Sequence, residues 1–139
     1  MEIQLARTDQ QILKCWEVMY ALRPHLQKEN FLPLIKEMMA DGYQIAFLEE
    51  NGKAISAIGF RYMQMLYNGK QFYIDDLSTL PAARGRGFGG ELLQFVEDLA
   101  REKGYQMITL DSGYQRYDAH RLYLNKGFRI DCHHLTKKL

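Results

Sequence analysis

The 139-residue chain has only two cysteines, Cys15 and Cys132, and no excess of either charge. Two cysteines build neither a disulfide framework nor a cysteine cluster for a metal. The 18 basic and 17 acidic residues nearly cancel, so charge gives no argument for nucleic acid or a membrane surface as a partner. The apolar runs are too short to span a bilayer, and the first residues lack a signal-peptide pattern. We therefore expect a cytoplasmic protein.

The composition is that of a globular protein, with 47% hydrophobic and 25% charged residues. A chain of this length can bury roughly 68% of its unfolded surface, which is enough for a core. At roughly 150 residues per domain, we expect residues 1–139 to form a single domain.

Hydrophobic periodicity in the first half predicts a short strand at Ile3 and Leu5, and then two helices. The residues expected to begin or end these helices are Thr8 with Gln11 as a capping box, Pro24, Asn30 with Pro33 in the first turn, and Gly42. Strands are predicted at 43–48, 54–65 and 72–80. The hairpin signals Asn51-Gly52 and Asn68-Gly69 separate them, which indicates an antiparallel meander.

The last third predicts a helix after a glycine-rich segment, a strand at 105–110, a helix at 118–126 and a strand at 128–135. A strand–helix–strand crossover gives parallel pairing. The expected fold class is therefore α/β, with a mixed sheet that is mostly antiparallel and is flanked by helices.

The segment from Arg84 to Gly90 joins a strand to a helix through four glycines. Glycines let a ligand approach the backbone closely, and the first amides of a helix attract anions such as phosphate. A merely tight turn is the alternative. The segment lacks the Gly-Lys-Ser/Thr ending of a Walker loop. A dinucleotide fingerprint, with Asp111 as its acidic residue, stays open as a third reading. We predict no metal site, because His133 and His134 point apart on a strand.

Two motifs make the chain resemble the GNAT superfamily of N-acetyltransferases. Arg84, Gly87 and Gly89 match the acetyl-coenzyme A signature, and a second family motif lies in the segment from Ala119 to Phe128. The order of elements agrees over nearly the whole chain. The resemblance implies a GNAT-like fold with a splayed parallel pair of strands, and acetyl-CoA as the co-substrate. The implied cofactor-binding residues are Leu77, Thr79, Arg84, Gly85, Arg86, Gly87, Phe88, Gly89, Gly90, Arg116, Ala119 and Tyr123. Many relatives carry Asn where this chain has Arg116.

The family moves an acetyl group to an amine by direct attack. The resemblance implies Tyr123 as the general acid, since a tyrosine stays protonated at neutral pH. A carboxylate would serve as the base, and Asp76 and Asp111 rank above Asp75. Neighbours on a strand face opposite sides, so at most one of Asp75 and Asp76 is expected to point into the site.

The acceptor side is expected to include Arg23, Tyr62, Asp75 and His120. The main interpretation is an enzyme that acetylates a primary amine, with a small-molecule acceptor favoured over a protein N-terminus or lysine. The rival is a CoA-binding sensor or partner module without catalysis, and a nucleotide-binding domain is a third interpretation. Relatives of this size often dimerise through edge strands, so the resemblance also allows a homodimer.

Overall fold

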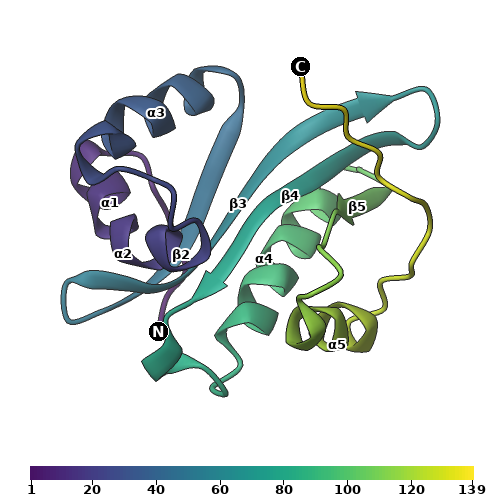
Figure 1. Cartoon of the computed structure of the whole chain (residues 1–139). Helices are drawn as coiled ribbons and strands as arrows, with labels where there is room; N and C mark the ends of the chain where they lie inside the picture. Colours follow the sequence, from purple (N-terminus) through teal and green to yellow (C-terminus); the bar gives the residue numbers. More distant parts are fainter. The chain divides into compact units, whose positions relative to one another are not determined.

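The computed structural model describes all 139 residues as two compact units, Met1–Thr109 and Leu110–Leu139, which we describe separately. Figure 1 shows the elements in chain order. They are β1 (Gln4–Leu5), α1 (Asp9–Lys14), α2 (Trp16–Leu22), α3 (Lys28–Ala40), β2 (Tyr43–Glu50), β3 (Lys53–Met65), β4 (Gly69–Thr79), the 3₁₀ turn η1 (Pro81–Ala83), α4 (Phe88–Glu102), β5 (Met107–Leu110) and α5 (Tyr117–Asn125).

The predicted capping box at the start of α1 is confirmed. The Thr8 hydroxyl accepts a hydrogen bond from the backbone N–H of Gln11 at 3.2 Å, and the Gln11 side chain accepts one from the Thr8 N–H at 3.1 Å. The first predicted helix is in fact two, because α1 ends and α2 begins at Cys15. The second of these ends at Leu22, just before Pro24.

The predicted start of the next helix was wrong. Helix α3 begins at Lys28, and the amide of Asn30 donates to the side chain of Gln27 at 2.9 Å instead of capping the helix. Pro33 consequently lies inside α3, beyond its first turn. A polar side chain with a nearby amide partner has an alternative to capping, which a residue-type pattern does not reveal.

The predicted meander is confirmed, since β1 to β5 form one sheet in sequence order and β2, β3 and β4 pair antiparallel. Asn51 and Gly52 both have positive φ, as the two-residue turn requires. The second hairpin differs, because Met65 pairs with Gly69 and leaves a three-residue loop. The last strand, β5, runs parallel to β4, so the sheet is mixed as predicted.

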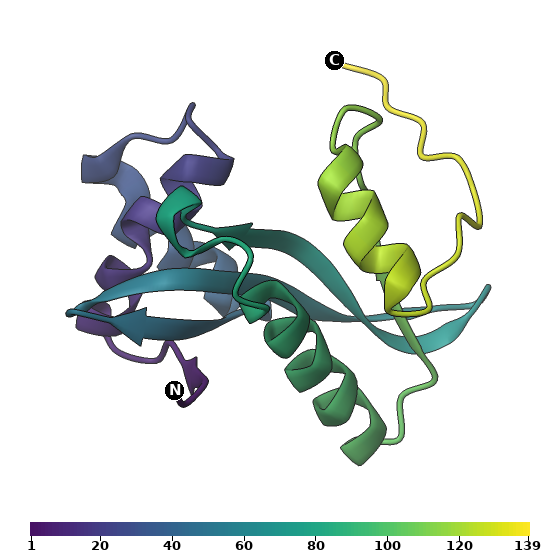
Figure 2. The ribbon, with the colours of Figure 1, turned by 90° about the horizontal axis from the view of Figure 1, so that it is seen from below.

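Both faces of this sheet are covered within the first unit. Figure 2 shows α1, α2 and α3 on one side of the strands and α4 on the other. Tyr43, Ile45 and Phe47 alternate along β2 into the core under α1 to α3. On the other side, α4 buries Leu92 and Val96 completely. The α4 helix is thereby fixed against the sheet, which holds the segment before it in place.

The second unit contains α5, which ends before Gly127 as predicted. The strand expected at 128–135 is absent, and that prediction was wrong. Ile130 and Leu135, two apolar residues within this range, are each 88% exposed. A strand needs a hydrogen-bonded neighbour and a buried face, and a local pattern of alternating residues specifies neither.

Candidate active site

The glycine-rich segment forms the connection from β4 to α4. After η1, Gly85 and Gly87 adopt the left-handed conformation, with φ of 79° and 84°. Gly87 is the N-cap residue of the 15-residue helix α4. A Cβ at either glycine would meet no atom within 4 Å, so the turn is open on that side. The first amides of α4 have no partner within the helix, which makes this end suited to an anion.

The two arginines of this segment are exposed and partly engaged. The Nε of Arg84 donates to the backbone carbonyl of Thr79 at 3.3 Å. Arg86 pairs with Glu50 at 3.2 Å and lies over the ring of Phe88, 4.6 Å from its centroid. The Phe88 ring itself is buried, so of this residue mainly the backbone can meet a ligand. Ion pairs this exposed contribute little stability and can exchange for another anion.

The end of β4 turns the backbone of Thr79 toward the outer edge of the strand. Leu80 donates to the carbonyl of Ile55 on β3 at 2.8 Å. Successive residues of a strand direct their backbone groups to opposite sides, so Leu77 and Thr79 face away from β3. The four residues of β5 can pair with only part of the eleven-residue β4. The backbone N–H of Gln106, just before β5, donates to the carbonyl of Lys70 near the start of β4.

A β-bulge interrupts β4 where its two aspartates lie. Gly59 is opposite Asp76 and Phe60 is opposite Ile74, so Asp75 is the extra residue. The strict alternation expected for Asp75 and Asp76 therefore fails. Both carboxylates reach partners on the face that carries Tyr43.

Asp76 is held by two donors. Its Oδ1 accepts from the Nε of Arg23 at 3.0 Å, and its Oδ2 accepts from the hydroxyl of Tyr43 at 2.7 Å. A second nitrogen of Arg23, Nη2, donates to the backbone carbonyl of Asp75 at 3.0 Å. Only 13% of the Asp76 side chain is exposed. This carboxylate is therefore oriented by its two donors and largely shielded from solvent.

Asp75 has its own arginine. Arg61 binds both carboxylate oxygens, with Nη2 to Oδ2 at 2.7 Å and Nε to Oδ1 at 3.0 Å. Burial raises the pKa of the Asp75 carboxyl above its ordinary value, and the hydrogen bonds of Arg61 act against that rise. The Arg61 guanidinium also lies over the Tyr43 ring, 5.4 Å from its centroid. The two aspartates, two arginines and Tyr43 form one neutral group, which we call the bulge cluster.

Gly59 makes room for this cluster. A Cβ on Gly59 would lie 1.9 Å from the Tyr43 hydroxyl, a distance that no side chain can occupy. Tyr43 on β2 thus crosses β3 at the one position without a side chain and reaches Asp76 on β4. Burial is the main cause that raises the pKa of the Tyr43 hydroxyl well above its ordinary value, and the charge of Asp76 raises it further.

The predicted acceptor residues belong to different elements and to both compact units of the chain. Arg23 and Asp75 belong to the bulge cluster, whereas Tyr62 is 43% exposed farther along β3, against the ring of Tyr105. His120 lies in the second unit, where its Nε2 is 2.8 Å from the carbonyl of Gly113.

Burial raises the pKa of the Cys15 thiol to about 12, so this cysteine is not a nucleophile at neutral pH.

The second unit carries the other predicted residues. Arg116 is the N-cap residue of α5, and Ala119 and Tyr123 are one turn apart on that helix. The Tyr123 ring packs against Phe128, with 5.7 Å between centroids. The Oδ1 of Asp111 lies 3.5 Å from the Nδ1 of His134. The sequence pattern gave no sign of His134 as a partner, because it was expected on a strand.

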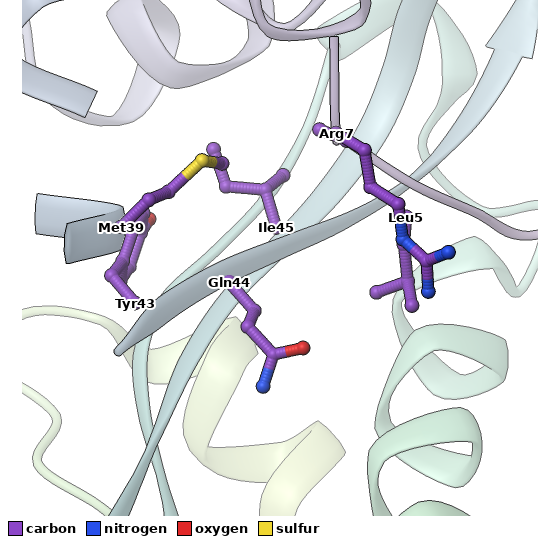
Figure 3. Close-up of a pocket in the computed structure, with 7 residues that line it drawn as sticks. Leu5, Arg7, Met39, Tyr43, Gln44 and Ile45 are labelled. Carbon is purple, nitrogen blue, oxygen red and sulfur yellow. The ribbon is translucent and has the colours of Figure 1, made fainter. Parts of the chain in front are cut away.

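A cavity of about 220 Å³ lies elsewhere in the first unit, between β1, β2 and the end of α3. Figure 3 shows Met39, Arg7 and Gln44 among its lining side chains. Of the bulge cluster, only Tyr43 reaches it.

No group of three or more potential metal ligands comes together in the structure. No helix has the length and apolar character needed to cross a bilayer.

The sequence model of the Acetyltransferase (GNAT) family matches residues 9–128. The chain belongs to the GNAT acetyltransferase family. It is 32% identical over 124 residues to the uncharacterized N-acetyltransferase YhdJ of Bacillus subtilis, which covers 88% of this chain and 87% of that protein. This GNAT chain is therefore an N-acetyltransferase, and its predicted family and fold are confirmed.

Two further proteins show the range of the similarity. The aminoalkylphosphonate N-acetyltransferase of Salmonella typhimurium is 32% identical over 98 residues, which span 70% of this chain and 62% of that protein. An aminoglycoside N-acetyltransferase, AAC(6')-Iy, solved in complex with CoA, superposes with a TM-score of 0.82 at 17% identity, over 99% of this chain and 95% of that one. The structural likeness shows the shared GNAT fold.

Tyr43 and Arg61 are the residues that sequence reasoning missed. Each reaches its partner across neighbouring strands, Tyr43 to Asp76 and Arg61 to Asp75. Neither lies in a recognisable motif, and their roles follow from the strand register and the bulge. A glycine inside a predicted strand, Gly59, was the one available signal of a close approach.

Proposed function

We propose that this N-acetyltransferase uses acetyl-CoA as donor and a primary amine of a small molecule as acceptor. The observation that carries the proposal is the open turn from Arg84 to Gly90, with left-handed Gly87 at the N-terminus of α4. It coincides with the family signature at Arg84, Gly87 and Gly89. The backbone amides of this turn and the two arginines would hold the phosphates. The outward-facing backbone of Leu77 and Thr79 would hold the amide-containing arm.

The reaction balances without any further reagent. The amine nitrogen forms a bond to the carbonyl carbon of the thioester, the C–S bond breaks, and its electron pair leaves with sulfur. The nitrogen gives up a proton and the thiolate gains one. We assign Tyr123 as the group that protonates sulfur, and Asp111 or Asp76 as the group that accepts the proton of the amine, directly or through water.

Burial and pairing separate the two carboxylates. Both oxygens of Asp76 accept hydrogen bonds from Arg23 and Tyr43. Asp111 is 40% exposed on its side chain and lies beside His134. A base must be reached by the amine or by a water that contacts it, and Asp111 meets this requirement with less rearrangement. We therefore rank Asp111 first, and Asp76 as an oriented negative charge near the bulge.

The remaining predicted residues take supporting roles in this proposal. Arg116 and Ala119, at the start of α5, would contact the donor, and the backbone of Gly85, Phe88 and Gly90 would complete the phosphate turn. Tyr62 and His120 would border the acceptor. We also propose that residues 1–139 act as one catalytic domain, supported by the family match, which extends over parts of both compact units.

The similarity to a relative named for aminoalkylphosphonates supports a small amine as acceptor. A transfer assay with three acceptor classes tests this: an aminoalkylphosphonate, a peptide with a free N-terminus, and an N-terminally blocked peptide with one lysine. We expect thiol release from acetyl-CoA with the small amine. Release with a peptide alone would contradict the small-molecule acceptor and leave the N-acetyltransferase intact.

Donor binding has a separate test. A ligand that binds only the folded chain raises its melting temperature. We expect acetyl-CoA and CoA to stabilise the chain and NAD to leave it unchanged. Stabilisation by NAD alone would favour a nucleotide-binding role. Stabilisation by CoA without turnover of any amine would favour a CoA-binding sensor.

A further inference from the structure

The side chain of Arg23 joins the end of α2 to the bulge in β4. We propose that Arg23 is a positioning residue for acyl transfer, which holds the Asp75–Asp76 peptide and the Asp76 carboxylate in one orientation. This inference rests on the proposed function, because it concerns the strand that the proposed donor would meet. It assigns Arg23 a role different from the acceptor binding predicted from the sequence.

The backbone of Arg23 is itself fixed at both ends. Its N–H donates to the carbonyl of Met19 at 2.8 Å, which closes α2, and its carbonyl accepts from Leu26 at 3.1 Å. Leu26 packs against the core under α1 to α3. The guanidinium therefore projects from an anchored backbone, and not from a free loop.

The two donors of Arg23 reach consecutive residues of the bulge. Nε binds the Asp76 carboxylate and Nη2 binds the Asp75 carbonyl, both at 3.0 Å. Asp75 is the extra residue of the bulge, so its backbone has no opposite residue on β3. Arg23 supplies that carbonyl with a partner from outside the sheet.

Holding this carbonyl also holds the amide on the other side of the same peptide. The carbonyl of Asp75 and the N–H of Asp76 belong to one planar unit and point in opposite directions. The Tyr43 hydroxyl, at 2.7 Å from Oδ2, prevents the carboxylate from rotating about Arg23. The bulge thus presents fixed dipoles next to Leu77 and Thr79, where small misplacements cost much of the rate.

The planar fork of arginine suits this role better than a lysine does. A guanidinium can serve a carboxylate and a carbonyl together, whereas an ammonium supplies mainly a point charge. Arg23→Lys keeps the charge and loses the fork, and Arg23→Gln loses both. Arg101→Gln is the matched control, because Arg101 is exposed on α4 and pairs with Glu97 within the same helix.

The test measures acetyl transfer to hydroxylamine, a small nucleophile without a carboxylate or phosphonate for Arg23 to bind. Thiol release above the uncatalysed rate is recorded for the wild type and the three variants, with melting temperature as the check of folding. We expect Arg23→Gln to lower kcat about 10²-fold. Arg23→Lys should be intermediate and Arg101→Gln unchanged. Stabilisation by acetyl-CoA should be the same in all four.

Several results would overturn the inference. An unchanged hydroxylamine rate in Arg23→Gln, with a raised KM only for an anionic amine, would make Arg23 an acceptor-binding residue. If Arg23→Gln does not fold, a wild-type rate in Arg23→Lys would be equally contrary. Absence of transfer by the wild-type chain to hydroxylamine and to every amine would instead overturn the proposed function, and this inference with it.

Discussion

Tyr43 shows how a single buried hydroxyl couples stability to pH. The side chain is 2% exposed, and its hydroxyl donates to Asp76 at 2.7 Å. Because its pKa is raised in the folded state, the folded chain keeps the proton while the unfolded chain loses it near pH 10. The stability that this hydroxyl contributes is present below about pH 10 and is lost as the pH rises further.

We predict that Tyr43→Phe costs about 1–3 kcal/mol in the free energy of unfolding at neutral pH, because Asp76 loses a donor. The difference between the variant and the wild type should shrink above about pH 10. Urea unfolding at several pH values measures both. Tyr20→Phe, on the 44% exposed Tyr20 of α2, is the control. A difference that stays constant into alkaline pH would contradict the raised pKa of Tyr43.

Tyr123 is the residue to which we assign proton donation. We predict that Tyr123→Phe lowers kcat about 10²-fold and leaves the affinity for acetyl-CoA nearly unchanged, because only the hydroxyl is removed. Steady-state kinetics and a cofactor titration give the two numbers. Tyr117→Phe on the same helix is the control, since its ring is 70% exposed. An unchanged kcat would remove Tyr123 from catalysis.

At the scale of elements, the turn between β4 and α4 is the part that the donor needs. We predict that Gly87→Asp abolishes stabilisation by acetyl-CoA, since it adds a carboxylate where a phosphate would bind. Gly87→Asn separates charge from strain, because asparagine has a similar size and tolerates the left-handed conformation of φ 84°. Thermal unfolding with and without acetyl-CoA measures both variants.

If Gly87→Asn still binds acetyl-CoA and Gly87→Asp does not, the loss of binding is due to the added charge. Equal loss in both would mean that the shape of the turn matters more. Binding to Gly87→Asp with wild-type affinity would be incompatible with a phosphate site at this turn.

Local chemistry predicted the elements whose causes are local. The capping box of Thr8 and Gln11 and the turn at Asn51-Gly52 depend on neighbours in sequence, and both were found. The prediction that Asn30 caps the next helix was wrong, because the amide of Asn30 donates to the side chain of Gln27 instead. The prediction of a strand at 128–135 was wrong, because strand formation depends on a partner segment, which the local residue pattern does not specify.

The candidate site divides in the same way. Arg84, Gly87 and Gly89 form a short motif, so the turn could be predicted and is built as expected. The bulge at Asp75 carries no residue type that marks it. The bond from Arg23 to Asp76 spans 53 positions, and that from Tyr43 spans 33. Contacts at such separations follow from register and packing, which single-sequence reasoning does not reach.

At the scale of the whole molecule, the residues proposed to bind acetyl-CoA belong to both compact units. We predict that acetyl-CoA slows amide hydrogen exchange in α5 as well as at the start of α4, because binding stabilises every segment that it contacts. Hydrogen exchange with and without acetyl-CoA measures this segment by segment. The Gly87→Asp variant should show neither effect. Slowing confined to the turn from Arg84 to Gly90 would contradict the roles of Arg116, Ala119 and Tyr123.

The most direct test follows both products of the reaction. The chain is incubated with acetyl-CoA and a set of small primary amines. Free thiol is then quantified, and the masses of the amines are measured by mass spectrometry. We predict one acetylated amine for each thiol released, with the activity lost in Gly87→Asp. Stabilisation by acetyl-CoA without an acetylated amine, or thiol release without one, would contradict the assignment as an acetyl-CoA-dependent transferase of small amines.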